Sequence, residues 1–570
     1  MVKNSQIASI LRELANYLEI EGENPFKIRA YKKAARVVES LGEEIEQMVK
    51  NREDLTKLPS IGKEIAAKIE EIVKTGRLQK LEELKRKIPP SLVELLSLEG
   101  LGAKKIKALY ENLNITNYEE LKEAALSHKI RELPGFGPKI EEKILKGLKL
   151  LKQEGFRFLY IEVEEVAKEL KEYIKSFSLV DRVEVAGSFR RAKESIADLD
   201  IVVSTNSPKE VIDYFLEFKA IEEIIVAGET KGRVVLDNKL QVDLRAIKPL
   251  HFGAALHYFT GSQSHVVAIR QLALDMGLKI NEYGVFKGEK IVASKSEDEV
   301  YGALNLAYIE PELRENRGEI EAAKSNRLPI LIEQDDLRGD LHMHTIYSDG
   351  ANSIEEMALA AKEMGYEYIA ISDHYSTIAL LKGLNPKKIL KEFEEIDRLN
   401  SKLNISILKS LEVDILEDGS LAASDEILKR ADIVVAAVHT KLRLSKKEQT
   451  KRVVRALLNR YVNILAHPMN RLIRKRDSID IDFKEIFKVA KDNNIFLEIN
   501  SQPTRLDLND ILAKEAKEMG VRFAISSDAH NIKELEFIKY GINQARRGWI
   551  EKKDVLNTLP LEELLEAIKR

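Results

Sequence analysis

The stretch VAGSFRRAKESIADLDIVV, residues 185–203, marks a β-rich region that follows a helical N-terminal part of the chain. Its second half, ADLDIVV, alternates carboxylates with aliphatic side chains and therefore predicts a strand. Asp198 and Asp200 lie two residues apart, so both carboxylates point to one face of that strand. The segment LQVDLR predicts a neighbouring strand that carries a third carboxylate, Asp243.

Three carboxylates on one sheet face repel one another unless they hold divalent cations. Mg²⁺ prefers such hard oxygen ligands, and a pair of ions roughly 3.5–4 Å apart activates a hydroxyl nucleophile and neutralises a leaving pyrophosphate. A D-x-D pair alone also fits an exposed polar edge. The surrounding residues favour a catalytic site with Asp198, Asp200 and Asp243 as ligands of two Mg²⁺ ions.

The turn Gly187-Ser188 lies ten residues before Asp198 and is followed by two arginines, and a second segment reads YFTGS at residues 258–262. Together these features resemble the palm of family X DNA polymerases. The resemblance implies a triphosphate site at Gly187, Ser188 and Arg191. It implies sugar selection at Tyr258, Phe259 and Gly261, and a template contact at Arg270. The chain departs from the family at Ala197, where glycine is usual, and at Val266, where relatives carry a base-contacting asparagine.

A short segment type occurs three times in the helical region: LPSIGKEIAAKI (58–69), LEGLGAKKIKAL (98–109) and LPGFGPKIEEKI (133–144). Each copy has a Gly-centred turn and then a basic helix start, where exposed amides can bind a phosphate oxygen. A single copy also fits ordinary helix packing, but three copies favour phosphate binding. The pattern resembles helix-hairpin-helix elements, which grip the DNA backbone through turns that here contain Gly62, Gly100, Gly102, Gly135 and Gly137.

The first copy belongs to a longer segment that resembles the lyase domain of DNA polymerase beta and its relatives. In that family a lysine forms a Schiff base with a 5′ deoxyribose phosphate, and the matching position here is Lys68. Neighbouring cations such as Lys27 and Lys33 favour a nucleophilic amine. Lys68 fits an exposed helix face equally well. Phe26 replaces a histidine that is common in the beta-type enzymes.

Strand-like runs alternate with helical patterns after residue 338. The runs fall near residues 339–342, 368–372, 405–413, 432–438, 462–466, 495–499 and 522–526. Helical patterns such as 353–364 and 482–491 each open with a residue type that is favoured at the N-cap. Seven such strands predict a βα barrel of about 230 residues.

Most of these predicted strands end on a side chain that can bind a metal. Because strand C-termini meet at one mouth of a βα barrel, the nine side chains would lie together there. A buried core histidine explains any one of them, but chance does not explain nine. The predicted metal ligands are His342, His344, Asp349, His374, Glu412, His439, His467, Asp528 and His530.

This pattern resembles the polymerase and histidinol phosphatase (PHP) domain, in which the cluster binds up to three divalent ions. Imidazole with carboxylate suits Mn²⁺ or Zn²⁺ better than Mg²⁺. The ions polarise a phosphodiester and lower the pKa of bound water. Asp373 is adjacent and fits an orienting role. Arg471, Arg474 and Arg505 fit either phosphate binding or a solvated surface.

The two resemblances cover nearly all of the 570 residues, a length that predicts several domains. We therefore predict a multidomain protein of α+β and α/β class, with a helical helix-hairpin-helix region, a nucleotidyltransferase palm and a C-terminal (β/α)7-type barrel. The predicted domains are a lyase-like region (1–85), a second helical DNA-binding region (86–152), the palm (153–248), a nucleotide-selection subdomain (249–315), a linker (316–336) and the PHP barrel (337–570).

Composition limits the remaining possibilities. The chain has no cysteine, which excludes disulfides and thiolate metal sites. No apolar run approaches membrane length and the N-terminus shows no signal peptide, so we expect a cytoplasmic protein without membrane contact. Residues 1–150 hold 28 Lys and Arg against 24 Asp and Glu, a weakly basic balance within a net charge of −3. Such a small excess is poor evidence for nucleic acid by itself.

These features predict a DNA-directed DNA polymerase that fills short gaps in base excision repair. The PHP domain would add Mn-dependent 3′–5′ exonuclease, abasic-site endonuclease or 3′ phosphoesterase activity. Lys68 would add 5′ deoxyribose phosphate lyase activity. The expected partners are gapped or nicked double-stranded DNA and dNTPs, bound by a monomer. Two alternatives are a small-molecule phosphatase tethered to DNA and a DNA-binding scaffold with inactive sites. The complete ligand sets argue against both.

Overall fold

The computed structural model describes residues 4–40, 45–58, 60–97, 101–154, 157–375 and 386–569, and the chain divides into two units. The first unit contains residues 1–155 and 472–477, and the second contains residues 156–471 and 478–570. Within the described ranges, every helix is too short or too polar to cross a membrane.

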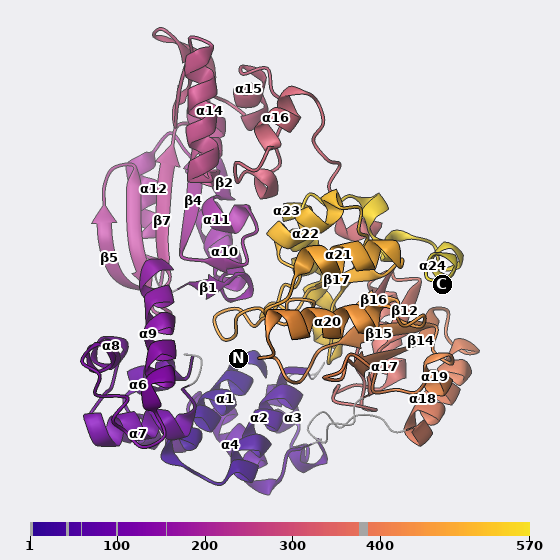
Figure 1. Ribbon diagram of the computed structural model, residues 1–570. Coiled ribbons are helices and arrows are strands. Elements are labelled where there is room, and N and C mark those ends of the chain that lie inside the picture. The colour runs from indigo at the N-terminus through magenta and orange to yellow at the C-terminus, as the bar shows by residue number, and fades with distance from the viewer. Residues whose placement is uncertain are drawn as a thin grey trace. The chain divides into compact units, whose positions relative to one another are not determined.

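Helices with aliphatic residues at helical spacing build the first unit (Figure 1). Their buried side chains, among them Leu11, Ile69 and Ile106, form a single hydrophobic cluster. The two helical regions expected from the sequence therefore share one core. The helices of this unit include α1 (Asn4–Glu21), α2 (Pro25–Ser40), α3 (Ile45–Lys50), α4 (Lys63–Thr75), α5 (Gln79–Lys87), α6 (Pro90–Glu94), α7 (Ala103–Leu113), α8 (Tyr118–Leu126) and α9 (Gly137–Glu154).

A five-stranded sheet begins the second unit, with its strands in the order β2-β4-β7-β6-β5. β4 and β7 are parallel, whereas the other neighbouring pairs are antiparallel. Leu199, Ile201 and Val203 of β4 pack with α10 and α12 in one cluster, which leaves the alternate residues of β4 on the opposite face. The bounds are β2 (Arg182–Val185), β4 (Asp198–Ser204), β5 (Ile221–Ala227), β6 (Lys231–Leu236), β7 (Gln241–Ile247), α10 (Tyr160–Lys175) and α12 (Pro208–Phe215).

A small mixed region follows, and its core extends into the segment expected as a linker. Residues 316–336 contain α16, whose Ile320 and Ala323 pack into the same cluster as Ile269 and Val300. The segment therefore covers apolar surface. The elements here are α13 (Phe252–Thr260), α14 (Gln263–Asp275), β8 (Lys279–Asn281), β9 (Gly284–Lys287), β10 (Lys290–Ala293), α15 (Glu297–Gly302) and α16 (Glu319–Lys324).

The C-terminal region confirms the predicted barrel. Its parallel strands run in the order β11-β12-β14-β15-β16-β17-β18, and the short strand β13 pairs with β14. A bridge from Met343 to Ala529 brings the two ends together, so the barrel is nearly closed. The strands are β11 (Gly339–Met343), β12 (Tyr368–Ile371), β13 (His374–Tyr375), β14 (Ser406–Asp414), β15 (Ile433–Ala437), β16 (Ile464–Leu465), β17 (Phe496–Asn500) and β18 (Phe523–Ser526).

Helices begin at the predicted caps and cover the barrel (Figure 1). Ser353 accepts from the Glu356 amide in a capping box, and Asp482 accepts from the Glu485 amide. Inside the barrel, Leu341 and Phe496 cluster with residues near the C-terminus such as Leu564. The helices are α17 (Ile354–Glu363), α18 (Pro386–Asn400), α19 (Asp425–Leu428), α20 (Lys446–Leu457), α21 (Phe483–Asp492), α22 (Asp510–Glu518), α23 (Ile538–Arg547) and α24 (Leu561–Ala567).

Candidate active sites

The three predicted catalytic aspartates lie on one face of two neighbouring strands. β4 carries Asp198 and Asp200, and the parallel register places Asp200 opposite Asp243 of β7. Burial and the nearby carboxylates of Asp198 and Asp243 raise the pKa of Asp200 to about 7. A divalent cation would relieve this repulsion, so the donor set fits the expected Mg²⁺ ions.

Asp243 also has protein partners. Arg233 of β6 donates to one carboxylate oxygen at 2.7 Å, and the Gln241 amide donates to the other at 3.0 Å. Lys231 lies 3.7 Å from the same carboxylate. Residues on β6 and β7 thus neutralise and orient the third aspartate.

The predicted triphosphate turn lies so close to the aspartate face that it requires a glycine at position 187. Gly187 begins the short helix α11 (Gly187–Arg190) with a φ of +59°. A Cβ atom at this position would lie 2.2 Å from Oδ2 of Asp200. The Ala186 amide also donates to the Asp200 carbonyl at 2.8 Å. Only glycine therefore lets the turn that contains Ser188 approach the metal ligands so closely.

The two arginines after the turn already have protein partners. Arg190 makes a bidentate ion pair with Glu297, with distances of 2.7 and 2.9 Å. Arg191 is 9% exposed and donates from Nε to Glu315 at 3.0 Å and from Nη1 to the Thr260 carbonyl. The guanidinium predicted to bind phosphate is thus held by an internal carboxylate.

The residues expected to contact the nucleotide sugar and the template lie on α13, at its C-cap and on α14. Tyr258 and Phe259 pack edge to face with ring centroids 5.3 Å apart. Gly261 has a φ of +72°, and a Cβ atom there would lie 3.0 Å from Nη1 of Arg191. On α14, Arg270 is exposed, whereas Val266 is only 8% exposed.

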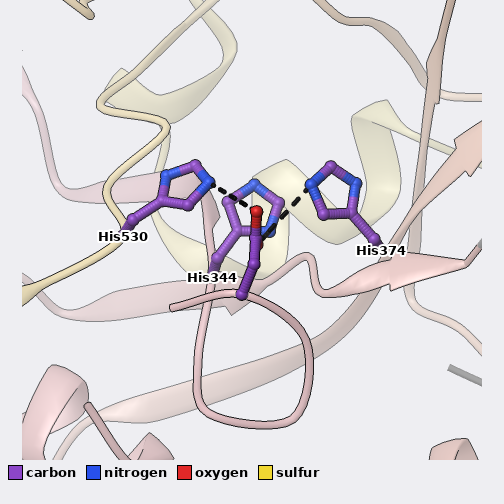
Figure 2. Close-up of side chains that lie close together, drawn as sticks. His344, His374 and His530 are labelled. Carbon is purple, nitrogen blue, oxygen red and sulfur yellow. Dashed lines mark ion pairs between the residues drawn. The ribbon is translucent and has the colours of Figure 1, made fainter. Parts of the chain in front are cut away.

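Ligand-type side chains from separate strands meet at the barrel mouth. Figure 2 shows His344, His374 and His530 pointing toward one another. Asp349 lies 3.5 Å from His530 and 3.6 Å from His374. Three groups bring together eight of the nine predicted ligands: His344, Asp349, His374 and His530; His342, His344 and Asp528; and His374, Glu412 and His439.

Glu412 of β14 connects the remaining ligand to these groups. Its carboxylate lies 3.0 Å from Nε2 of His467, 2.7 Å from Nδ1 of His374 and 3.3 Å from Nε2 of His439. Burial alone would raise the pKa of Glu412, but the surrounding imidazoles hold it well below its usual range. All nine predicted ligands therefore belong to one connected cluster.

The cluster fits a metal centre because some of its donors lack a protein partner. Nδ1 of His344 and Nδ1 of His467 are buried, and neither has a hydrogen-bond partner within the described part of the chain. A buried polar atom without a partner is unfavourable unless an ion or water binds it. Neutral imidazoles and carboxylates are the donors that Mn²⁺ and Zn²⁺ accept.

A carboxylate that was not among the predicted site residues orients two of these ligands. Glu498 is fully buried on β17, the barrel strand without a predicted ligand. It accepts from Nδ1 of His342 at 2.7 Å and from the His467 amide at 2.7 Å. The sequence contained one signal for Glu498. It is the single polar residue in the apolar run IFLEI (495–499), which is the only predicted barrel strand without a predicted ligand.

Other buried polar groups complete this outer layer. Asp414 contacts Nδ1 of His439, and the Asn500 amide donates to Asp528 at 2.9 Å. The Asp373 carboxylate accepts from the Thr345 amide at 2.8 Å and so orders the loop after β11, and the Asp373 carbonyl accepts from the Glu412 amide at 3.3 Å. Metal ligands are commonly oriented by such partners.

The three arginines near the barrel differ in their surroundings. Arg471 makes a bidentate ion pair with Glu194, with distances of 3.1 and 2.6 Å, so it ties the barrel to the five-stranded sheet region. Arg505 lies 4.0 Å from Asp528, and its Nη1 is buried with no hydrogen-bond partner in the described ranges. Arg505 is therefore the better placed of these two for a substrate phosphate. Arg474 belongs to the segment 472–477 of the first unit.

The glycine turns of the first unit leave helix ends open. Gly62 and Gly102 precede α4 and α7 with φ values of −85° and −79°, and neither has a heavy atom within 4 Å of an added Cβ. The third copy differs, because Gly135 and Gly137 both have positive φ values, but it is equally open. Gly100 lies outside the described residues. Each of the four described glycines is therefore open on the side where a side chain would point.

Lys68 on α4 lies in a small polar cluster. Its amine donates to Glu64 at 3.0 Å and sits 5.8 Å from the ring centroid of Tyr31. The Tyr31 hydroxyl donates to the same carboxylate at 2.9 Å, and Lys27 lies 3.7 Å away from it. With 19% of its side chain exposed, Lys68 can be reached from solvent.

Comparison with known proteins links these sites to named families. Residues 2–78 match a helix-hairpin-helix domain, 92–150 a SAM-like helix-hairpin-helix tandem, 255–315 the DNA polymerase beta thumb and 340–502 the PHP domain. The DNA polymerase/3′-5′ exonuclease PolX of Bacillus subtilis (strain 168) is 39% identical over 569 residues, which cover 99% of both chains. A probable phosphatase of Thermoanaerobacter sp. (strain X514) is 33% identical over 247 residues, 40% of this chain and 95% of its own.

Proposed function

Since the chain belongs to the family X DNA polymerases with helix-hairpin-helix, polymerase beta thumb and PHP domains, we propose that it fills short DNA gaps in base excision repair. The observation that carries the polymerase assignment is the aspartate face. Asp198, Asp200 and Asp243 share one face of β4 and β7, and burial raises the pKa of Asp200 to about 7. A carboxylate set with this much repulsion is suited to bind two Mg²⁺ ions.

The bound ions would activate the primer hydroxyl and neutralise the leaving pyrophosphate. The chain's own residues bind and orient the nucleotide. Gly187, Ser188 and Arg191 hold the triphosphate beside Asp200. Tyr258, Phe259 and Gly261 border the sugar, and Arg270, which is exposed on α14, reaches the template.

The helical unit holds gapped or nicked double-stranded DNA through its phosphates. The turns at Gly62, Gly102, Gly135 and Gly137 support this role, and the sequence of the second turn adds Gly100 to the proposed DNA-binding set. Backbone amides at helix N-termini bind phosphate without reading sequence, which suits an enzyme that acts at gaps of any sequence. Lys68, reachable from solvent, removes a 5′ deoxyribose phosphate. The working form is a monomer.

The PHP domain cleaves phosphoesters at a centre of up to three Mn²⁺ or Zn²⁺ ions. Nine ligands shared among three ions would give about three protein ligands for each and would leave positions for water and phosphate. Bound there, the ions would polarise the phosphoester and activate water. Because a relative is named a 3′-5′ exonuclease and another a probable phosphatase, we assign 3′–5′ exonuclease, abasic-site endonuclease or 3′ phosphoesterase activity to this centre.

A double dissociation on one gapped duplex tests the proposal. Asp200→Asn or Asp243→Ala should abolish dNTP addition and leave Mn²⁺-dependent cleavage intact, because the two ligand sets share no residue. His344→Ala should do the reverse. Labelled primer and template strands on one denaturing gel report both reactions.

Three results would contradict the proposed function. Full extension by Asp243→Ala would remove the two-metal assignment of the aspartate face. Cleavage of a small phosphomonoester without any cleavage of DNA would favour a small-molecule phosphatase in the PHP domain. Wild-type protein that binds the duplex without extension or cleavage would favour the inactive scaffold.

A further inference from the structure

Arg547, the last residue of α23 in the PHP domain, is buried against the polymerase part of the chain. Only 2% of the residue is exposed. Its Nη1 donates to the Arg191 carbonyl at 2.7 Å and to Glu315 at 3.1 Å, and its Nη2 donates to Asp510 at 2.6 Å. A residue of the nuclease domain thus contacts the main chain of the proposed triphosphate turn.

Glu315 is the carboxylate that this arginine shares with the polymerase site. Arg191 donates to the same Oε1 atom at 3.0 Å, so one carboxylate oxygen holds two guanidinium groups. Burial would raise the pKa of Glu315, but the charges of Arg547, Arg191 and Lys193 together lower it, and only the two arginines are hydrogen-bonded to its carboxylate in the described residues. Glu315 is therefore charged in a region from which water is largely excluded.

The contact of both arginines with Glu315 affects how readily Arg191 can bind a nucleotide. When the Arg191 side chain turns from Glu315 to a triphosphate, Glu315 loses one of its two hydrogen-bonded arginines. A buried carboxylate left without a partner is strongly destabilising. Arg547 remains bonded to Glu315 and neutralises it. The free-energy cost of moving Arg191 from Glu315 to the triphosphate is therefore much smaller.

We propose that Arg547 is a positioning residue for the polymerase reaction, because it keeps Glu315 paired while Arg191 moves from Glu315 to the incoming triphosphate. The inference rests on the proposed triphosphate role of Arg191. It makes nucleotide affinity at the polymerase site depend on a side chain of the PHP domain. Cleavage at the PHP centre does not depend on this contact.

Steady-state kinetics of gap filling test the proposal in the full-length protein. Arg547→Met should raise the KM for dNTP by about tenfold or more and change kcat little, because nucleotide binding must then leave Glu315 unpaired. The rate of Mn²⁺-dependent DNA cleavage should stay at the wild-type value. The double variant Arg547→Met/Glu315→Gln should recover most of the wild-type KM, because no buried carboxylate remains to retain Arg191.

Lys539→Met is a matched control. Lys539 also belongs to α23 and pairs with Glu164 of α10 at 2.8 Å, so it joins the same two regions without touching Arg191. Its removal should leave the KM for dNTP unchanged. An equal rise in KM for Lys539→Met would show that general loosening of the domains explains the effect, and the proposal would fail.

The single variant Glu315→Gln keeps the proposal testable even if Arg547→Met does not fold. It should leave the KM for dNTP unchanged or lower, whereas a purely structural ion-pair network predicts a rise. Arg191→Ala distinguishes the role of Arg191 from that of Arg547. An unchanged KM for dNTP in Arg191→Ala would overturn the triphosphate role of Arg191. A raised KM in Arg191→Ala together with a wild-type KM in folded Arg547→Met would overturn only the role of Arg547.

Discussion

Glu498→Gln should weaken metal binding at the PHP centre without removing a ligand. The carboxylate accepts from His342 at one oxygen and from the His467 amide and Asn500 at the other. A glutamine side chain has one oxygen and one NH2 group, so it can accept on only one of these sides. On the other side, two donors would face each other.

The expected loss of Mn²⁺ affinity follows from the hydrogen bond that Glu498→Gln removes. A hydrogen bond to a charged group contributes about 1.5–3 kcal/mol, and 1.4 kcal/mol corresponds to a tenfold change in affinity. Because His342 and His467 are oriented through this carboxylate, we expect Mn²⁺ affinity to fall by roughly 10–100-fold, the range typical of such outer partners.

Metal content after equilibrium dialysis against graded Mn²⁺ measures this change directly. Gap filling by the same preparation reports whether the protein is folded, since the aspartate face contains none of these residues. Glu392→Gln is a matched control, because Glu392 is another fully buried carboxylate of the barrel region with no hydrogen bond within the described residues. Affinity within twofold of wild type in folded Glu498→Gln would refute the orienting role.

The remaining predictions concern stability and the lyase. Burial opposes the charge of Glu297, but Arg190 and Arg314 lower its pKa to about 2. This ion pairing stabilises the fold by roughly 3 kcal/mol above pH 4.5, and the contribution is lost as the pH falls toward 2. The difference in thermal midpoint between wild type and Glu297→Gln should therefore be large at pH 7 and shrink by pH 3; a constant difference would contradict this. Borohydride should trap the protein on a 5′ deoxyribose phosphate, and Lys68→Ala should lose most of that adduct, whereas an undiminished adduct would place the nucleophile elsewhere.

Local patterns were enough to predict the barrel and the positions of its candidate ligands. Strand-length apolar runs and N-caps such as Ser353 and Asp482 depend on neighbours in the chain, and the structure confirms the fold class they predict. Parallel strands also bring their C-terminal ends to one side of a sheet by geometry alone. Residues as distant in sequence as His342 and Asp528 could therefore be predicted to lie together.

The same reasoning predicted that Asp198 and Asp200 share one strand face, because side chains in a strand alternate with period two. It could not give the register that sets Asp200 opposite Asp243, since strand pairing depends on contacts between separate segments. The sequence also predicted a linker at residues 316–336, but it did not indicate that α16 in this segment packs into a core through Ile320 and Ala323.

By itself, the sequence determined the strands, the helices and the residue types at the two candidate centres, because these follow from periodicity and from the chemistry of neighbouring side chains. Only the tertiary structure decided which charges share a partner. Glu498 meets His342 across 156 positions, and Arg547 meets Arg191 across 356. No local pattern encodes such pairs, since they depend on how separately folded layers pack and exclude water around buried charges.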